Sequence, residues 1–210
     1  MAGPEPALID LVRAIAARDA EEVARLLEAS PALAGASADS GATRREAAPF
    51  YLDEIDHYVY AGDTALHIAA AAHEPSLVRS LLDLDADSSA RNRRGAQPLH
   101  YAADGIPGSD TWQPAAQAAT IATLIAAGAD PNATDNSGVA PLHRAVRTRC
   151  SAAVRALLDG GADPRHPNKS GSTPMKLATR PTGRGGSGSP EAKAQQAAIV
   201  QLLEQHGGSP

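Results

Sequence analysis

One short segment of the chain combines side chains that can transfer protons or hold a metal ion. Its charged members lie close together, and phenols flank them: Asp53, Glu54, Asp56 and His57, with Tyr51, Tyr58 and Tyr60. Carboxylates, an imidazole and phenols at short range suit acid–base catalysis or binding of a divalent cation. However, the segment has one histidine and its spacing matches no metal-ligand motif. We therefore expect no catalytic residue and no metal site here.

The rest of the chain offers no stronger catalytic or cofactor signature. The run Gly183-Arg184-Gly185-Gly186 is rich in glycine, but it lacks the Gly-Lys-Ser/Thr ending of a phosphate-binding loop. There is no Cys-x-x-Cys, no His-Glu-x-x-His and no nucleophile elbow. We expect no cofactor and a protein that is not an enzyme. The alternative is a small-molecule or enzymatic site under the aromatic segment, built from Tyr58, His57, Asp56 and Trp112.

Composition narrows the classes of partner and compartment. The net charge of −5 argues against a general nucleic-acid or anionic-membrane surface. No run approaches the ~18–20 apolar residues of a membrane span, and no charged-then-apolar leader opens the chain. The single cysteine, Cys150, excludes an intramolecular disulfide and fits a reducing compartment, where it would be a buried small hydrophobe. We expect a cytoplasmic protein.

A nine-residue pattern occurs four times and organises the whole chain. Its copies begin at Gly62, Gly95, Gly138 and Gly171, which are 33, 43 and 33 residues apart. The first copy reads Gly-Asp-Thr-Ala-Leu-His-Ile-Ala-Ala, and a second, bulkier apolar motif follows each copy. The glycines stand where a tight turn needs a positive φ, and Thr-Pro or its equivalent then begins a helix.

This repeated Thr-Pro-Leu-His-x-Ala core, near 33 residues in period, resembles the ankyrin repeat of bacterial-type proteins. The resemblance implies an all-α repeat solenoid of about five repeats, each a helix–turn–helix with a hairpin finger, including two caps. It also implies that the motif's histidines, His67, His100 and His143, hydrogen-bond between adjacent repeats. The last copy carries Lys176 instead, where no further repeat follows.

The period divides the chain into six segments. They are an N-terminal capping helix pair (1–34), an aromatic and acidic insertion (35–58), a regular repeat (59–91), a repeat with an insertion between its helices (92–134), a second regular repeat (135–167), and a C-terminal capping repeat with a Gly/Ser-rich insertion (168–210). Extra residues fall at 35–58, 104–114 and 180–192. The first part of the first insertion, 35–48, is small and polar, so we expect it to be mobile.

The second part of that insertion, 49–60, holds four of the chain's six aromatic residues. A loop with this composition either packs down as a local lid or presents a recognition surface, and both can hold together. The alternation in His57-Tyr58-Val59-Tyr60 also permits a short strand.

In the family that the chain resembles, partners dock on the concave side, on finger tips and inner-helix positions. Carried onto this sequence, with the insertion added, the predicted partner-binding residues are Phe50, Tyr51, Asp53, Glu54, His57, Tyr58, Tyr60, Asp63, Arg93, Arg94, Asp104, Asn136, Val139, Arg147, Lys169 and Ser172. This groove would be aromatic and acidic at its N-terminal end and basic in the middle. A simpler alternative is that Arg91, Arg93 and Arg94 merely pair with Asp53, Glu54 and Asp56.

The sequence thus predicts a non-catalytic interaction module that binds a protein or peptide with acidic and apolar features. We expect a monomer, with self-association through the aromatic loop or the alanine-rich helices as a further possibility. The sequence does not identify the partner, because a shared fold does not fix the target.

Overall fold

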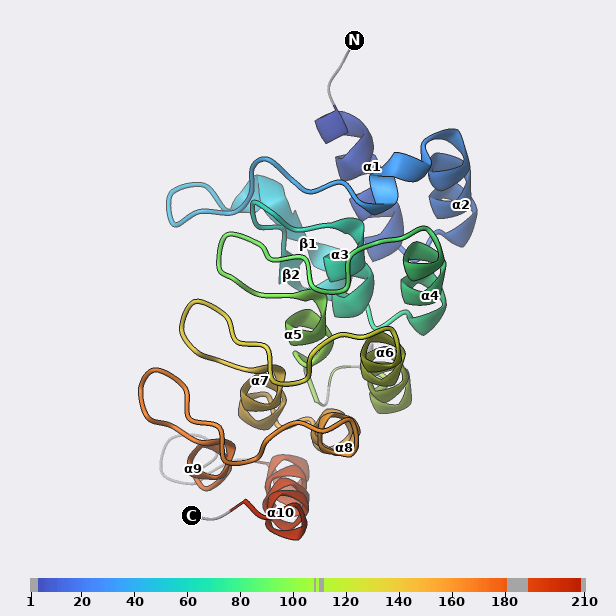
Figure 1. Cartoon of the computed structure of the whole chain (residues 1–210). Helices are drawn as coiled ribbons and strands as arrows, with labels where there is room; N and C mark the ends of the chain where they lie inside the picture. The colour runs from blue at the N-terminus through green and yellow to red at the C-terminus, as the bar shows by residue number, and fades with distance from the viewer. Residues whose placement is uncertain (1–3, 108, 110–111, 181–188, 209–210) are drawn as a thin grey trace.

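A computed structural model describes residues 4–107, 109, 112–180 and 189–208 (Figure 1). Within them the chain forms two stacked layers of helices, with loops that project from one side. The layer beside these loops, here the inner layer, consists of α1 (Pro4–Ala16), α3 (Ala65–Ala71), α5 (Pro98–Ala102), α7 (Pro141–Arg147) and α9 (Pro174–Ala178). The outer layer consists of α2 (Ala20–Ala29), α4 (Pro75–Asp83), α6 (Pro114–Ala126), α8 (Ser151–Asp159) and α10 (Pro190–Gln205).

Most helices pack on their counterparts in the next repeat, as a solenoid requires, whereas α2 packs on α1. Along the inner layer α1 contacts α3, α3 contacts α5, α5 contacts α7 and α7 contacts α9. Along the outer layer α4 contacts α6, α6 contacts α8 and α8 contacts α10. The predicted all-α repeat solenoid is confirmed. Among the described residues, no helix has the length and apolar content to cross a lipid bilayer.

The turn chemistry of the repeat matches its backbone. Gly62 has φ +86°, and a Cβ there would stand 2.8 Å from the Cα of Asn92 in the next finger. Only glycine fits both the turn and this close approach. Asp85 has φ 60° at the place where two later repeats have glycine, as its tolerance of the left-handed region allows. Helix-starting prolines stand in the first turn of α5, α7 and α9.

The motif's histidines join neighbouring repeats. In each, Nδ1 accepts the backbone N–H three residues earlier, at 3.1–3.2 Å. That contact leaves the proton on Nε2, which donates to a carbonyl of the following repeat: His67 to Ala96 (3.2 Å), His100 to Val139 (3.0 Å) and His143 to Ser172 (3.1 Å). The role implied by the family resemblance is present in all three copies.

The insertion folds against the first repeats. It follows η1 (Pro31–Ala34), and it forms short 3₁₀ turns and a two-stranded antiparallel sheet in the order η2 (Ala48–Phe50), β1 (Tyr51–Leu52), η3 (Asp53–Ile55) and β2 (His57–Tyr58). Tyr51 pairs with Tyr58, and Leu52 pairs with His57. The buried side chains of Leu52 and Val59 join the core. The insertion therefore packs down as a lid.

The expectation that 35–48 is mobile is wrong for most of that segment. Ala38 and Ala42 donate backbone hydrogen bonds to the carbonyls of Asp63 and Val59, both at 2.8 Å. A Cβ on Gly41 would meet the backbone of Tyr60 at 2.4 Å, so the two segments lie in direct contact. Backbone pairing with the following finger orders a segment whose side chains alone suggest mobility. The central part of the 104–114 insertion and most of the 180–192 insertion lie outside the described residues.

Candidate interaction surface

The two strands of the insertion send neighbouring side chains to opposite faces. His57 turns inward, and its ring packs on Tyr101 of α5 with centroids 4.5 Å apart. Tyr58 turns outward, is 37% exposed and packs on Tyr51 at 4.7 Å. Asp56 occupies the left-handed turn between the strands and accepts the Tyr51 hydroxyl. Because neighbouring residues of a strand point to opposite faces, His57 and Tyr58 do not lie on the same face of the sheet.

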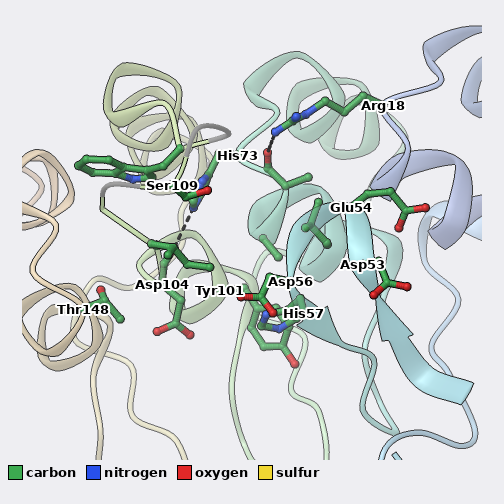
Figure 2. A pocket seen from close by; sticks show the side chains of 16 residues that line it. Arg18, Asp53, Glu54, Asp56, His57, His73, Tyr101, Asp104, Ser109 and Thr148 are labelled. Atoms are coloured by element: carbon green, nitrogen blue, oxygen red, sulfur yellow. Dashed lines mark hydrogen bonds between the residues drawn. The ribbon is translucent and has the colours of Figure 1, made fainter. Parts of the chain in front are cut away.

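A cavity of about 560 Å³ lies between the insertion, the first repeats and the 104–114 insertion (Figure 2). We call it the acidic cavity, because its lining includes the carboxyl side chains of Asp53, Glu54, Asp56 and Asp104. Figure 2 shows Asp53 and Glu54 on the side of the strands and Asp104 on the opposite side, with Asp56 and His57 between them. Its volume is in the range typical of ligand sites.

His57 is the least expected member of this lining. Its Nε2 atom is buried and has no hydrogen-bond partner among the described residues. Burial lowers the pKa of His57, with the carboxylates of Asp104 and Asp63 opposing that effect, so the ring is neutral near pH 7. An unpaired buried nitrogen carries a desolvation cost. The described residues thus leave one nitrogen of this ring without a hydrogen bond.

Two of the charges around the acidic cavity are already balanced. Arg18 pairs with Glu74 at 2.6 Å and donates to the carbonyl of Ala72 at 3.2 Å. Asp104 accepts from Arg144 at 2.8 Å and lies 3.8 Å from Arg147. By contrast, the carboxylates of the insertion form no ion pair with any described residue.

The finger arginines do not neutralise those carboxylates, which overturns the simpler alternative of the sequence analysis. Arg91 donates to the carbonyl of Thr134 at 2.6 Å, and Arg93 donates to the carbonyl of Ala42. Arg94 lies over the ring of Tyr60, with its guanidinium carbon 4.9 Å from the ring centroid. The finger arginines and the insertion carboxylates therefore form no ion pairs with one another.

A second depression, of about 480 Å³, collects the positive charge. We call it the basic depression; its lining includes Arg44, Arg93 and Arg94 with Tyr58 and Tyr60, and no carboxyl side chain. Arg93 also lies over the Tyr60 ring, at 5.5 Å. Both guanidinium groups thus contact one aromatic ring, whose face attracts cations.

A central depression of about 300 Å³ joins the other two. It shares Tyr58, Tyr60 and Arg94 with the basic depression, and Asp56, His57, Tyr101 and Asp104 with the acidic cavity. The three hollows are thus adjacent, and we call them together the trough; its lining is negative at one end and positive at the other. Val139 and Arg147, both predicted contact residues, also line its centre.

A buried network fixes the floor of this trough. The Tyr101 hydroxyl donates to the Asp63 carboxylate at 2.9 Å, and the Asn92 amide donates to the same carboxylate at 2.8 Å. The Asn92 side-chain oxygen accepts the backbone N–H groups of Arg94 and Ala96. Burial, followed by the Asp63 charge, raises the pKa of Tyr101 above its usual value, so the phenol stays protonated. This network positions the Arg93–Arg94 finger.

Several predicted contact residues therefore have other places in the structure. Asp63 (1% exposed) and Ser172 (9% exposed) are buried, because they complete hydrogen bonds within and between repeats. Phe50 lines a separate hollow beside α1. Asn136 and Lys169 brace adjacent fingers, with Asn136 donating to the Arg93 carbonyl at 3.1 Å and Lys169 donating to the Asn136 carbonyl at 2.8 Å. Tyr51 lines another separate hollow, beside α1. The remaining predicted residues line the trough.

The residues of the trough that sequence reasoning missed include Arg44, Asn92, Tyr101 and Arg144. Tyr101 offered a signal, since a phenol stands where the equivalent positions of the other copies carry Ile68, Arg144 and Leu177. A buried phenol needs a hydrogen-bond partner, which predicts a polar group beneath it. Arg44 offered no signal, because its segment looked unstructured.

Comparisons with known proteins agree with the repeat architecture. A family model described as "Ankyrin repeat" matches residues 61–93, and one described as "Ankyrin repeats (many copies)" matches residues 124–178. NF-kappa-B inhibitor delta of Mus musculus is 34% identical over 96 residues, which cover 44% of this chain and 26% of that protein. Tyrosine-protein kinase Shark of Drosophila melanogaster is 35% identical over 87 residues, covering 41% of this chain and 8% of that protein.

The chain thus spans about a quarter of the length of the NF-kappa-B inhibitor and less than a tenth of the length of the kinase. The two family matches fall on the helix pairs that the structure stacks, and the histidine contacts recur in each of the three copies that carry the residue. Together these observations show that the chain is an ankyrin-repeat protein.

Proposed function

We propose that this protein is a non-catalytic scaffold that binds an acidic, partly apolar segment of a partner protein along the trough and the 49–60 insertion. Ankyrin repeats in general mediate protein–protein interaction, through the extended inner surface that stacking creates. The name of one relative describes an inhibitor of NF-kappa-B, which is consistent with a binding role in that protein.

The observation that carries this proposal is the basic depression. Arg44 and Arg94 have no carboxylate partner among the described residues, and Arg94 is held over Tyr60. Guanidinium groups form bidentate hydrogen bonds with carboxylates, and arginine and tyrosine are enriched at the energetic centres of interfaces. A glutamate or aspartate of the partner would complete this site, while the exposed face of Tyr58 offers apolar contact.

A catalytic role has weaker support. Among the described residues no hydrogen bond joins His57 to Asp56 or Tyr58, and Asp56 accepts the Tyr51 hydroxyl. General acid–base catalysis needs its groups within hydrogen-bond reach of a shared substrate atom. The other alternative, a small-molecule site under the aromatic segment, is favoured by one observation: Nε2 of His57, which lines the acidic cavity, has no partner among the described residues.

A fluorescence anisotropy assay tests the scaffold proposal. The probe is a labelled peptide of alternating glutamate and leucine, compared with its glutamine counterpart. Substituting Arg94→Gln or Arg44→Gln should weaken binding of the glutamate peptide about tenfold, equivalent to ~1.4 kcal/mol. Arg155→Gln, on the exposed outer face of α8, is the matched control and should leave binding unchanged. Equal binding of the two peptides, or equal loss in the control, would refute the proposal.

A further inference from the structure

The acidic cavity carries an excess of negative charge that the chain itself does not balance. Asp53 and Glu54 form no ion pair with a described residue, and Asp56 accepts the Tyr51 hydroxyl, which is uncharged. The cavity's own cation, Arg18, is already bound to Glu74. A guest that carries a positive charge would therefore meet three carboxylates without displacing an existing ion pair.

The uncharged polar groups of this cavity are compatible with such a guest. His57 and His73 both line it, and burial lowers the pKa of each, so neither ring repels a cation near pH 7. His73 is already engaged, through Nε2, with the carbonyl of Asp104 at 2.9 Å. His57 is not, because its buried Nε2 has no partner among the described residues.

The apolar part of the lining adds a place for a hydrocarbon stem. Ile55, Ile106 and Trp112 line the cavity, and Ile106 is 49% exposed. Exposed apolar side chains of this kind gain stability when an aliphatic chain covers them. The rings of Tyr101 and Trp112 are also groups that attract cations through their faces.

We propose that the acidic cavity binds an ammonium or guanidinium group on a short aliphatic stem, the chemistry of a lysine or arginine side chain or of a free amine. The insertion carboxylates hold the charge, and Ile106 and Trp112 cover the stem. This site is distinct from the basic depression, with which it shares no lining residue. This proposal is independent of the proposal that an acidic segment binds, so either one can be refuted without the other.

Trp112 makes this inference directly testable, since it is the only tryptophan of the chain and it lines the cavity. The probes are N-acetyl-arginine methylamide and the citrulline analogue, which has the same shape without the charge. We expect the arginine probe to change Trp112 emission in a saturable way and the citrulline probe to leave it unchanged. A saturable response to citrulline of equal affinity, or no saturable response to the arginine probe, would overturn the proposal.

Charge-neutralising variants locate the effect. Substituting Asp53→Asn, Glu54→Gln and Asp56→Asn together should raise the Kd of the arginine probe at least tenfold. Glu54→Gln alone, at an exposed side chain without a hydrogen bond, should raise it by a smaller factor and serves if the triple variant does not fold. The matched control removes three exposed carboxylates of the outer helices, by Glu28→Gln, Asp83→Asn and Glu204→Gln. An equal loss in that control would mean that only net charge matters, which refutes the site.

A third probe distinguishes the two sources of the cation. Butylguanidinium carries the charge and the stem without a peptide backbone. If it binds as tightly as the arginine probe, the cavity recognises a free amine or guanidine. If the arginine probe binds more tightly, the cavity recognises a basic residue within a polypeptide. Either result supports the shared chemistry, and weaker binding of the cations than of citrulline would contradict it.

Discussion

Replacing His100 with glutamine should reduce the sensitivity of this protein to acid. His100 is buried, its Nδ1 accepts the N–H of Gln97 and its Nε2 donates to the carbonyl of Val139. Burial, with Arg144 as the next cause, lowers the pKa of His100 from 6.5 to about 3 in the folded protein. The neutral ring therefore forms part of the link between two repeats.

The sign of the effect follows from proton uptake. Between pH 6.5 and about pH 3 the unfolded chain binds a proton at His100 that the folded chain does not. The stability that this neutral histidine contributes is fully present above pH 6.5 and is lost as the pH falls toward 3. As the pH falls from about 7.5 to about 5, this single group should lower the free energy of unfolding by about 2 kcal/mol. His67 and His143, whose pKa values burial also lowers, act in the same direction.

Urea unfolding followed by far-ultraviolet circular dichroism measures this loss. At neutral pH the His100→Gln variant should be less stable than the native chain, because a buried backbone N–H loses its acceptor. However, when the pH falls from the higher to the lower value, the free energy of unfolding of the variant should decrease by about 2 kcal/mol less than that of the native chain. For a typical urea dependence, this difference corresponds to roughly 1 M in the urea midpoint. An identical loss in both proteins would show that His100 is not held neutral in the fold.

Three further outcomes follow from the packing. Tyr101→Phe removes the hydroxyl that donates to the buried Asp63 carboxylate, and it should lower the free energy of unfolding by ~1–3 kcal/mol in urea titrations; an unchanged midpoint would contradict the network. Leu142→Ala, at a side chain 1% exposed in α7, should cost ~2–5 kcal/mol, and a negligible loss would contradict the stacking. Burial raises the pKa of the Cys150 thiol to about 11, so a disulfide reagent at about pH 8 should label it only after denaturation.

The repeat itself was predictable because it depends on local signals that recur. Each glycine turn, helix-starting residue and bridging histidine acts within one copy or between adjacent copies, so the period of the sequence carries the fold. The alternation at His57 and Tyr58 also carried usable information, since it indicates that the two rings face opposite sides.

The rest depended on contacts between segments that the sequence does not place. Asp63 looked like an exposed finger residue, but Asn92 and Tyr101 of the next repeat bury it. The path of Arg93 toward Ala42, rather than toward the insertion carboxylates, follows from the way residues 38–42 pair with the next finger. Each of these outcomes is set by tertiary packing, which outweighs the local preference of the residue.

The central claim is that an acidic segment docks on the inner face at the basic depression. An NMR titration of the ¹⁵N-labelled protein with the glutamate–leucine peptide tests it most directly. We predict that the largest amide shift changes fall at Arg44, Tyr58, Tyr60, Arg93 and Arg94, and that they disappear in Arg94→Gln. Shift changes confined to the outer helices α4, α6 and α8, or no changes at any peptide concentration, would contradict it.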